Sequence, residues 1–348
     1  MNTIKKANSC KYVTDFTINR DIIKSYRPKP GDAVIFEVLK LCSLKAIEDF
    51  EGRNCYIFKG DHIMVTFGNR YASNQFEAYI PKEYQEAYDL VGKGGVVGNV
   101  ASMCYKLESM GPTKLKLVGY ATNVKGEVIN TRYHHRETTQ FQPVKTRPFK
   151  TILSVGASMD SGKTTTAAFL CRGLKNAGYN LAYIKLTGTI FNKDKMLCYD
   201  CGADYVTDFS EMGYPSTYLC DLDEILNIHE GLLQEVTTTN PDYVVIEIAD
   251  GLYQRETYQL LNHLPFTDTL NHVILSCGDS LAVNSGIKLL SPIFGERLFA
   301  LSGLFTGSPL QVKEVEKQEL LPVLTLKKLM DGNLLNELLP GKKAKMIV

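Results

Sequence analysis

The segment Gly156-Ala-Ser-Met-Asp-Ser-Gly-Lys-Thr-Thr165 constrains the fold of this chain more than any other part of the sequence. It follows the apolar run Thr151-Ile-Leu-Ser-Val and precedes a stretch typical of a helix over 163–177. A glycine-rich turn between a strand and a helix directs backbone N–H groups and the helix N-terminus toward an anion. The pattern therefore predicts a phosphate-binding loop. The alternative is a glycine turn followed by an exposed lysine.

The predicted loop assigns distinct tasks to its last residues. Lys163 would bridge the outer phosphates of a nucleotide, and the hydroxyl of Thr164 would bind Mg²⁺. Backbone and side chains of the whole loop would surround the phosphates. The predicted nucleotide-binding residues are Gly156, Ser158, Asp160, Ser161, Gly162, Lys163, Thr164 and Thr165.

Residues 151–348 alternate between short apolar runs and helical stretches. Continuous apolar strands separated by helices predict a mostly parallel sheet covered by helices, an α/β fold. Besides the run before the loop, the expected strands are Leu181–Ile184, Tyr243–Ile248, His272–Ser276 and Leu298–Leu301.

Residues 1–133 have a different pattern. Short β-branched and aromatic runs at 33–39, 55–58, 62–67 and 115–120 are separated by turn residues, which predicts a small barrel or sandwich of unknown role. Residues 134–150 are polar, contain two prolines and lack periodicity, so we expect a linker there. The expected domains are therefore a β-rich domain, a linker and an α/β domain.

The charge balance limits the partners of the chain. Lys and Arg total 39 and Asp and Glu total 38, so the net charge is +1. Such a chain has no global field to attract nucleic acid or anionic lipid. No apolar run approaches the ~20 residues of a membrane helix, and no apolar stretch follows the basic pair near the start. With nine scattered cysteines, we expect a cytoplasmic protein with reduced thiols.

The spacing within the loop suggests a family. Five residues separate Gly156 from Gly162, one more than usual, and this lengthened loop resembles that of the dethiobiotin synthetase branch of P-loop proteins. The resemblance covers roughly 151–325. It also rests on four further segments: Ile184-Lys-Leu-Thr-Gly188, the next stretch with Asp194, Val244-Val-Ile-Glu-Ile-Ala-Asp-Gly-Leu252 and Val273-Ile-Leu-Ser-Cys-Gly-Asp-Ser-Leu281.

The resemblance implies ATP and Mg²⁺ as cofactors, with Lys163 and Lys185 as catalytic lysines. It also implies a metal site formed by Thr164, Asp194 and Glu247. Two departures concern the ligands. Asp250 replaces a small residue of the family's glycine-rich turn, and Leu301-Ser-Gly-Leu stands where the family has an asparagine that reads adenine.

Elementary chemistry supports part of this set. Glu247 ends an apolar strand, where a carboxylate is costly unless it holds a metal or water; a strand-end surface acid is the alternative. Lys185 follows apolar residues and needs a partner such as a phosphate or a carboxylate, although it could instead extend to solvent. Asp194 lies in a polar stretch where a solvated acid costs little, so the residues alone favour a solvated acid and only the resemblance implies a metal ligand.

Weaker candidates remain. Thr187, Asp250, Gly251 and Arg255 are predicted substrate residues, because loops at the carboxyl ends of parallel strands bind ligands. A helix cap and a solvated helix face are the alternative for the last three. We interpret Cys198 and Cys201 as packed thiols and Gly92–Gly98 as a bulge or hinge. The neighbouring residues His134 and His135 are expected to be solvated.

Together, these features predict an ATP- and Mg²⁺-dependent enzyme. The expected reaction is activation of a small-molecule carboxylate or carbamate by phosphoryl transfer, as in a ligase or kinase, in a homodimer. The first alternative is a regulatory or metallochaperone-like P-loop NTPase whose hydrolysis drives a dimer or partner switch. The second is a nucleotide-binding assembly protein with little turnover.

Overall fold

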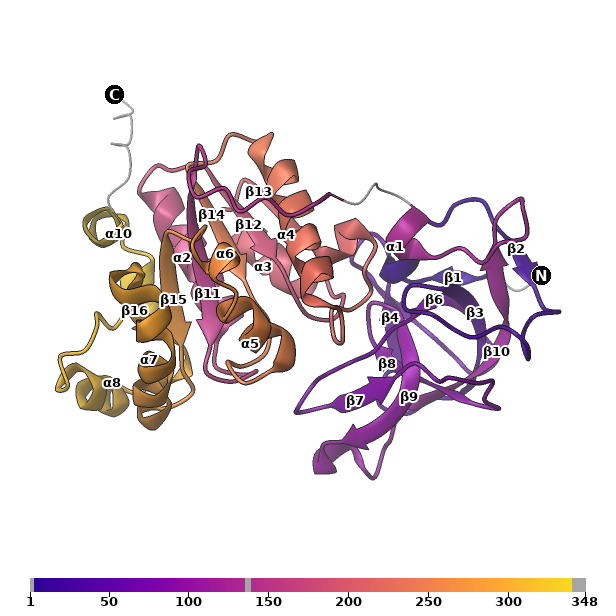
Figure 1. Cartoon of the computed structure of the whole chain (residues 1–348). Helices are drawn as coiled ribbons and strands as arrows, with labels where there is room; N and C mark the ends of the chain where they lie inside the picture. Colours follow the sequence, from indigo (N-terminus) through magenta and orange to yellow (C-terminus); the bar gives the residue numbers. More distant parts are fainter. Residues whose placement is uncertain (1–2, 135–138, 340–348) are drawn as a thin grey trace. The chain divides into compact units, whose positions relative to one another are not determined.

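The computed structural model describes residues 3–134 and 139–339, which form two compact units (Figure 1). The first, the β unit, contains the chain up to residue 134 and two later segments, Gly188–Lys193 and Phe209–Leu219. The second, the α/β unit, contains residues 139–187, 194–208 and 220–339. Residues 135–138 of the expected linker, including His135, and residues 340–348 of the expected α/β domain lie outside the described residues.

The β unit is built on one sheet, which has eight strands in the described part of the chain. β6 pairs with β3, β3 with β10, β10 with β8, β8 with β9, and β9 again with β6, so these strands form a closed barrel. Of the barrel and sandwich expected from the sequence, the structure has the barrel. The strands of this sheet are β1 (Lys5–Lys6), β2 (Thr17–Asn19), β3 (Ala33–Lys40), β6 (His62–Phe67), β7 (Phe76–Tyr79), β8 (Tyr88–Gly92), β9 (Val96–Met103) and β10 (Thr113–Thr122).

Aromatic residues fill the barrel. Phe36 on β3 packs edge-on against Phe67 on β6 and Tyr88 on β8, with ring centroids 5.8 and 5.1 Å apart. These side chains are buried, and edge-to-face packing is the favoured geometry for such rings. Outside the main sheet lie the hairpin of β4 (Ala46–Glu48) and β5 (Asn54–Tyr56) and the short helix α1 (Thr131–His134).

The Gly92–Gly98 segment forms the turn between β8 and β9 and the start of β9. The pairing of the two strands shifts register between Leu90 and Gly92, as expected for a bulge. Gly95 has φ +98°, and a Cβ there would lie 2.2 Å from the Cβ of Ala7. This turn therefore requires glycine for packing within the β unit.

The two later segments of the β unit leave the α/β sheet after neighbouring strands. The N–H of Ile190 donates to the carbonyl of Pro215 at 3.0 Å, so the segments pair with each other. The N–H of Asn192 donates to the buried carboxylate of Glu48 at 3.0 Å, and the hydroxyl of Thr131 donates to the carbonyl of Gly213 at 2.7 Å. Both segments are thus part of the β unit, although the sequence suggests that they belong to the α/β domain.

The α/β unit has a fully parallel sheet with the order β13-β12-β14-β11-β15-β16. This architecture confirms the predicted fold class. All carboxyl ends of the strands therefore lie at one edge. The strands are β11 (Lys150–Gly156), β12 (Leu181–Lys185), β13 (Tyr205–Asp208), β14 (Tyr243–Glu247), β15 (His272–Ser276) and β16 (Leu298–Ser302).

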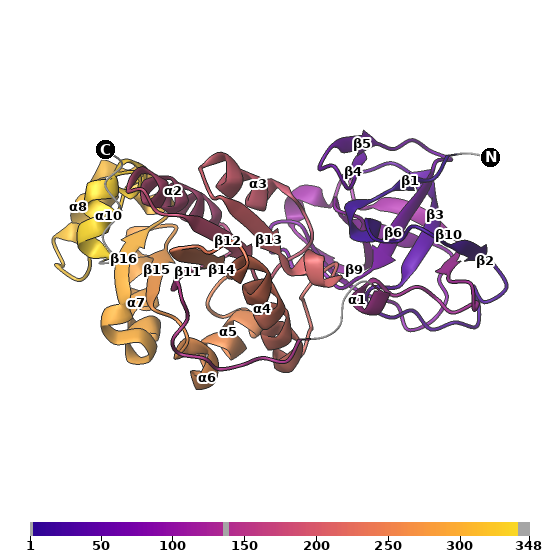
Figure 2. The same cartoon turned by 90° about the horizontal axis from the view of Figure 1, so that it is seen from above.

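Helices cover both faces of this sheet. Figure 2 shows α2 and α3 on one face and α4, α5 and α7 on the other. α2 follows the predicted loop and ends one residue before the expected position. The helices are α2 (Lys163–Asn176), α3 (Lys193–Asp200), α4 (Leu222–Thr237), α5 (Arg255–Leu261), α6 (Leu264–Thr267), α7 (Ser280–Phe294), α8 (Pro309–Glu316), α9 (Leu326–Leu329) and α10 (Gly332–Leu338).

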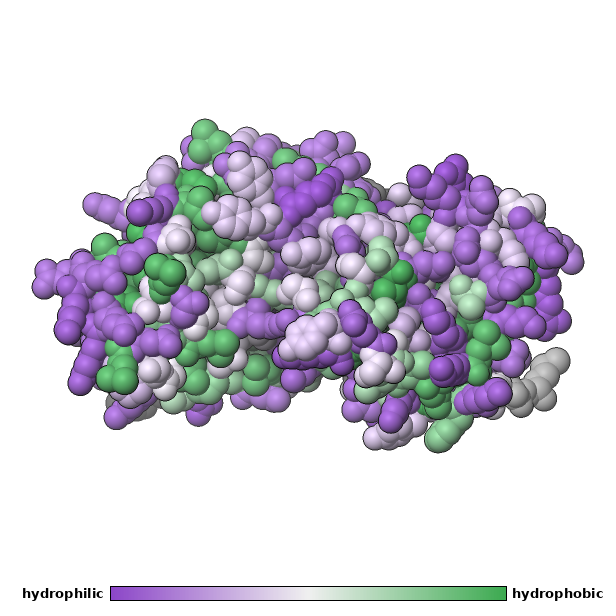
Figure 3. Space-filling view, turned by 90° about the horizontal axis from the view of Figure 1, so that it is seen from below, coloured by the Kyte–Doolittle hydropathy of each residue, from purple (hydrophilic) through white to green (hydrophobic). Residues whose placement is uncertain are grey.

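Polar residues cover much of the surface in the view of Figure 3, with apolar patches between them. Within the described residues, no helix has both the length and the apolar character needed to cross a bilayer. All nine cysteines are described and carry free thiols. Cys198 is buried in the α/β core, where its thiol contacts that of Cys171, as expected for a packed residue.

Candidate nucleotide-binding site

The loop between β11 and α2 needs glycine at both ends. Gly162 precedes α2 with φ +94°, a conformation that L-residues rarely adopt. At Gly156, an added Cβ would lie 2.1 Å from the Oγ of Ser161. The loop therefore folds tightly on itself and opens directly into the N-terminus of a 14-residue helix, the arrangement that the sequence predicts.

Lys163 is turned back into this loop. Its Nζ donates to the carbonyl oxygens of Ser158 and Met159 at 3.0 and 2.7 Å. Only 4% of the residue is exposed. Burial lowers the pKa of Lys163 below its ordinary value, while the carboxylates of Glu247 and Asp250 act in the opposite direction. An anion at the loop would compensate this burial.

Ser161 provides a second indication of a ligand. Its hydroxyl oxygen is buried and has no hydrogen-bond partner among the described residues. A buried polar atom without a partner loses its hydration and gains nothing in return, at a cost of about 1–3 kcal/mol. Because this atom lies in the same loop as Lys163, the loop fits a phosphate-bearing ligand.

Glu247 connects the loop with the neighbouring strands. At the end of β14, its Oε1 accepts a hydrogen bond of 2.9 Å from the hydroxyl of Thr164, and its Oε2 accepts one of 2.8 Å from Tyr183. The carboxylate is only 1% exposed. Burial, reinforced by the charge of Glu247, raises the pKa of Tyr183 well above its ordinary value, so this hydroxyl remains a donor.

Lys185 and Asp194 form an ion pair. The Nζ of Lys185, at the end of β12, donates to Oδ2 of Asp194 in α3. Burial alone would lower the pKa of Lys185, but the carboxylates of Asp194 and Glu247 raise it above its ordinary value. In this arrangement Asp194 neutralises Lys185, and Glu247 is the carboxylate that contacts the phosphate loop.

Three of the four predicted substrate residues, Thr187, Asp250 and Gly251, belong to the turn after β14 or contact it. The hydroxyl of Thr187 accepts a hydrogen bond of 2.9 Å from the N–H of Ala249, and a Cβ on Gly251 would lie 2.8 Å from Cα of Ser158. The turn after β14 is therefore packed against the phosphate loop. Asp250 in this turn has φ +64°, a left-handed conformation that residues other than glycine rarely adopt.

Arg255 is engaged elsewhere. Its Nη1 donates to the carbonyl of Cys220 at 2.9 Å and to Oε1 of Glu256 at 2.6 Å. Its guanidinium is thus anchored to the protein at the start of α5. The role of Arg255 as a substrate residue stays a prediction.

A cavity of about 340 Å³ adjoins the start of α2. Its volume is in the range of small-molecule sites. Gly303 is held close to the loop, because the N–H of Leu304 donates to the carbonyl of Ser161 at 3.0 Å. The cavity is lined by Gly162, Thr165, Thr166, Gly303, Leu304, Thr306, Gly307, Thr325, Leu326 and Lys327.

The sequence interpretation missed Tyr183 and most of this cavity. Tyr183 lies two residues before Lys185 on β12, and alternation along a strand places both side chains on the same face of the sheet. That spacing was the available signal. For the cavity, the signal was the pair Gly303 and Gly307 after a predicted strand. In the described residues, no cluster of three or more His, Cys, Asp or Glu side chains is arranged to hold a metal, so Cys198 and Cys201 form no such centre.

The fold and the loop define the class: the α/β unit has the strand–loop–helix arrangement of P-loop proteins. No protein-family model matches the sequence, and no curated protein matches it. Solved structures that resemble the chain include proteins with bound GDP or ADP. One is the signal recognition particle receptor FtsY from Elizabethkingia anophelis in complex with GDP, with a TM-score of 0.34, 16% identity and coverage of 55% of this chain and 54% of that chain.

Two others come from Archaeoglobus fulgidus. The hydrogenase maturation factor HypB has a TM-score of 0.33 and 13% identity, over 52% of this chain and 83% of that chain. A nucleotide-binding protein in complex with ADP has a TM-score of 0.32 and 12% identity, over 57% and 91%. The chain spans about half the length of the FtsY structure above. At these scores the functions of the neighbours do not transfer to this chain, and no comparison supports a dethiobiotin synthetase.

Proposed function

We propose that the α/β unit binds ATP with Mg²⁺ and hydrolyses it, and that its nucleotide state controls the β unit, as in a regulatory NTPase. The contact between Thr164 and Glu247, 2.9 Å long at the base of the phosphate loop, carries this proposal. It joins a hydroxyl and a carboxylate, two oxygen ligands suited to Mg²⁺, beside a loop with a buried lysine and an unsatisfied hydroxyl.

The phosphates would be held by this chain's own donors. Backbone N–H groups at the start of α2 carry the positive end of the helix dipole. The Nζ of Lys163 would exchange two neutral carbonyls for phosphate oxygens, and the hydroxyl of Ser161 would gain a partner. Charge-assisted hydrogen bonds are stronger than neutral ones, so this exchange favours the bound state.

Thr164 and Glu247 would hold Mg²⁺, directly or through its water. The ion, when bound, neutralises negative charge on the outer phosphates. Tyr183 fixes the carboxylate by binding its second oxygen. Lys185, paired with Asp194 and close enough to Glu247 to be influenced by it, would add positive charge at the same edge of the sheet.

The base would occupy the 340 Å³ cavity beside α2. Its lining includes the hydroxyls of Thr165, Thr306 and Thr325 and an apolar wall formed by Leu304 and Leu326, but no carboxylate. Guanine presents an N1–H and an amino group together on one edge, which a carboxylate pairs well. The lining therefore favours adenine.

The path of the chain favours a regulatory NTPase, which would act on the β unit, rather than a ligase. Gly188–Lys193 follows Thr187 and precedes Asp194, so a segment of the β unit is covalently flanked by two residues of the site. Phe209–Leu219 likewise follows β13 and pairs with the first segment. A shift of Asp194 relative to Lys185 on nucleotide binding would act directly on both segments.

The first test is the Lys163→Ala variant. We expect ATP affinity to fall and phosphate release to drop by roughly 10²-fold or more, the scale of losing a preorganised charge. Lys288→Ala, an exposed lysine of α7, is the matched control and should behave like the wild type. Unchanged ATP affinity of Lys163→Ala in isothermal titration calorimetry would refute the site.

The second test addresses the switch. Hydrogen exchange of Gly188–Lys193 and Phe209–Leu219 should slow or accelerate when a non-hydrolysable ATP analogue is added with Mg²⁺, and should not respond in Lys163→Ala. Hydrolysis that proceeds with no change in either segment would reject control of the β unit while leaving the NTPase intact. Strong stimulation by a small carboxylate would instead favour the ligase.

A further inference from the structure

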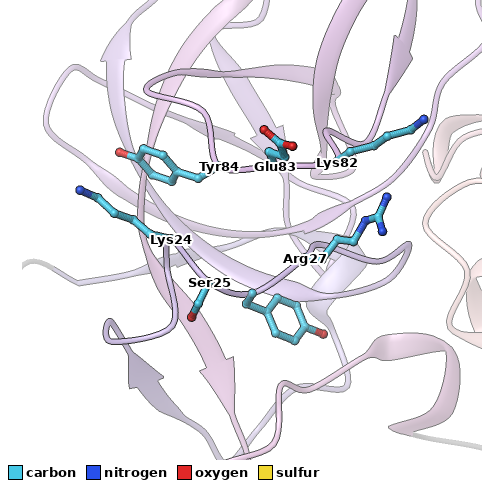
Figure 4. Close-up of a pocket in the computed structure, with 7 residues that line it drawn as sticks. Lys24, Ser25, Arg27, Lys82, Glu83 and Tyr84 are labelled. Carbon is cyan, nitrogen blue, oxygen red and sulfur yellow. The ribbon is translucent and has the colours of Figure 1, made fainter.

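The β unit has a pocket of about 410 Å³ that the proposed NTPase does not use. Two connections form it: Lys24–Arg27, between β2 and β3, and Lys82–Tyr84, between β7 and β8. Figure 4 shows side chains of both connections around it, with Arg27 and Lys82 on one side and Lys24 and Tyr84 on the other. Its volume suits a small molecule.

The backbone of both connections is held in place. Tyr26 packs edge-on against Tyr120 of the barrel, with ring centroids 4.8 Å apart, and its N–H donates to the carbonyl of Ile22 at 2.8 Å. On the other connection, the N–H of Gln85 donates to the hydroxyl of Tyr88 at 3.0 Å. These contacts position the backbone of both connections beside the pocket.

The charges of the pocket are unbalanced. Lys24, Arg27 and Lys82 line it with a single acid, Glu83. Within the described residues none of these three cations has an ion-pair partner, whereas other lysines of the β unit are paired, such as Lys114 with Asp89 at 2.6 Å. In a chain of net charge +1, this is a local concentration of positive charge in a concave surface, which focuses the field on an anion.

The side chains differ in what they can offer. Arg27 has a planar fork that can bind two oxygens of one phosphate or carboxylate, and the lysines act as point charges. The Nζ of Lys24 lies 6.0 Å from the ring centre of Tyr84, a cation–π contact that limits where this ammonium group can move. Three cations against one acid leave an excess of two positive charges.

We propose that this pocket binds a small molecule carrying two negative charges, a phosphate ester or a dicarboxylate. The charge excess matches such a dianion. This would give the β unit a ligand of its own, separate from the nucleotide of the α/β unit. The proposal does not depend on the nucleotide site, because every contact that supports it lies within the β unit.

The test uses the full chain with Lys163→Ala, so that the phosphate loop contributes little to binding. Isothermal titration with phenyl phosphate, a monoester that is a dianion slightly above neutral pH, and, separately, with malonate should give saturable binding of at least one of them at millimolar concentration or below. Binding of phenyl phosphate alone would identify a phosphate ligand, and binding of malonate alone a dicarboxylate. Absence of saturable binding of both would overturn the proposal.

Variants locate the site. Arg27→Ala and Lys82→Ala should each weaken binding of the probe about tenfold, the effect of losing one charge-assisted contact. Lys125→Ala, at an exposed turn of the same unit, is the control and should bind like the parent. Glu83→Gln should bind more tightly, since it removes the one opposing charge, and raised salt should weaken every complex. Equal affinity in parent, Arg27→Ala and Lys82→Ala would overturn the assignment.

Discussion

Tyr183 on β12 donates a 2.8 Å hydrogen bond to Oε2 of Glu247 on β14, while Oε1 of the same carboxylate accepts from Thr164. The carboxylate is thus fixed between a strand and the first turn of α2. With both oxygens accepting hydrogen bonds, the orientation of the carboxylate is restrained. Tyr183 is therefore a positioning residue for the proposed Mg²⁺ site.

Replacing Tyr183 with Phe should reduce ATP turnover about fivefold, because one buried hydrogen bond contributes about 1 kcal/mol to holding the carboxylate. The Mg²⁺ concentration that gives half-maximal rate should rise, whereas ATP affinity should change little. Steady-state kinetics at varied Mg²⁺ and varied ATP separate the change in Mg²⁺ requirement from a change in ATP affinity. Tyr179→Phe removes the hydroxyl of another buried tyrosine, one outside the phosphate loop and its hydrogen bonds, and serves as the control. The same loss in both variants would contradict a positioning role.

Glu247→Gln should retain much of the ATP affinity and lose most of the turnover, on the order of 10²-fold. The amide keeps the size of the side chain but not the charge that attracts Mg²⁺. Asp194→Asn should have a milder effect, because Asp194 contacts Lys185 rather than the loop. Calorimetry measures the ATP affinity, and phosphate release measures the turnover. A larger loss in Asp194→Asn than in Glu247→Gln would reverse the proposed roles.

Gly251→Ala should weaken ATP binding roughly tenfold to a hundredfold although Gly251 lies outside the phosphate loop. Its new Cβ would lie 2.8 Å from Cα of Ser158 and 2.9 Å from the carbonyl oxygen of Ala157, so the loop must shift. At Gly278, after β15, an added Cβ meets nothing within 4 Å, and Gly278→Ala should bind ATP normally. Equal affinity of both variants would show that the loop absorbs the displacement.

His229 should make the fold sensitive to acid. Burial, with a smaller effect of Arg147, lowers the pKa of His229 to about 3, and neither ring nitrogen has a hydrogen-bond partner among the described residues. Between pH 6.5 and about 3 the unfolded chain binds a proton that the folded chain does not, so stability falls as the pH falls.

Over two pH units within that window, the free energy of unfolding should decrease by roughly 2–3 kcal/mol from this residue. His229→Phe should remove this part of the decrease, because the ring already packs between Phe141 and Phe266. Urea unfolding at pH 6.5 and 4.5 measures the free energy of unfolding of both proteins. If this free energy falls between the two pH values as much in His229→Phe as in the wild type, the assignment is contradicted.

Local sequence determined the phosphate loop and the α/β fold class. The strand, the glycine turn and the helix are contiguous, so the residues from Gly156 to Thr165 specify their own geometry through backbone conformation and helix dipole. The apolar strands from Thr151 onward likewise indicated a parallel sheet, because continuous apolar runs need cover on both faces.

Only the tertiary structure decided which side chains meet. Three contacts join residues whose proximity no local sequence pattern predicts. They are the pairing of β6 with β9 that closes the barrel, the hydrogen bond between Tyr183 and Glu247, and the ion pair of Lys185 and Asp194. The same holds for Lys24, Arg27 and Lys82, which line one pocket although they come from two separate connections. The physical reason is that charge and hydrogen-bond energies depend on distance in space, and long-range pairings that close loops of the chain set that distance. Beyond a single strand or helix, the spacing of two residues in the sequence does not give the distance between their side chains in the fold.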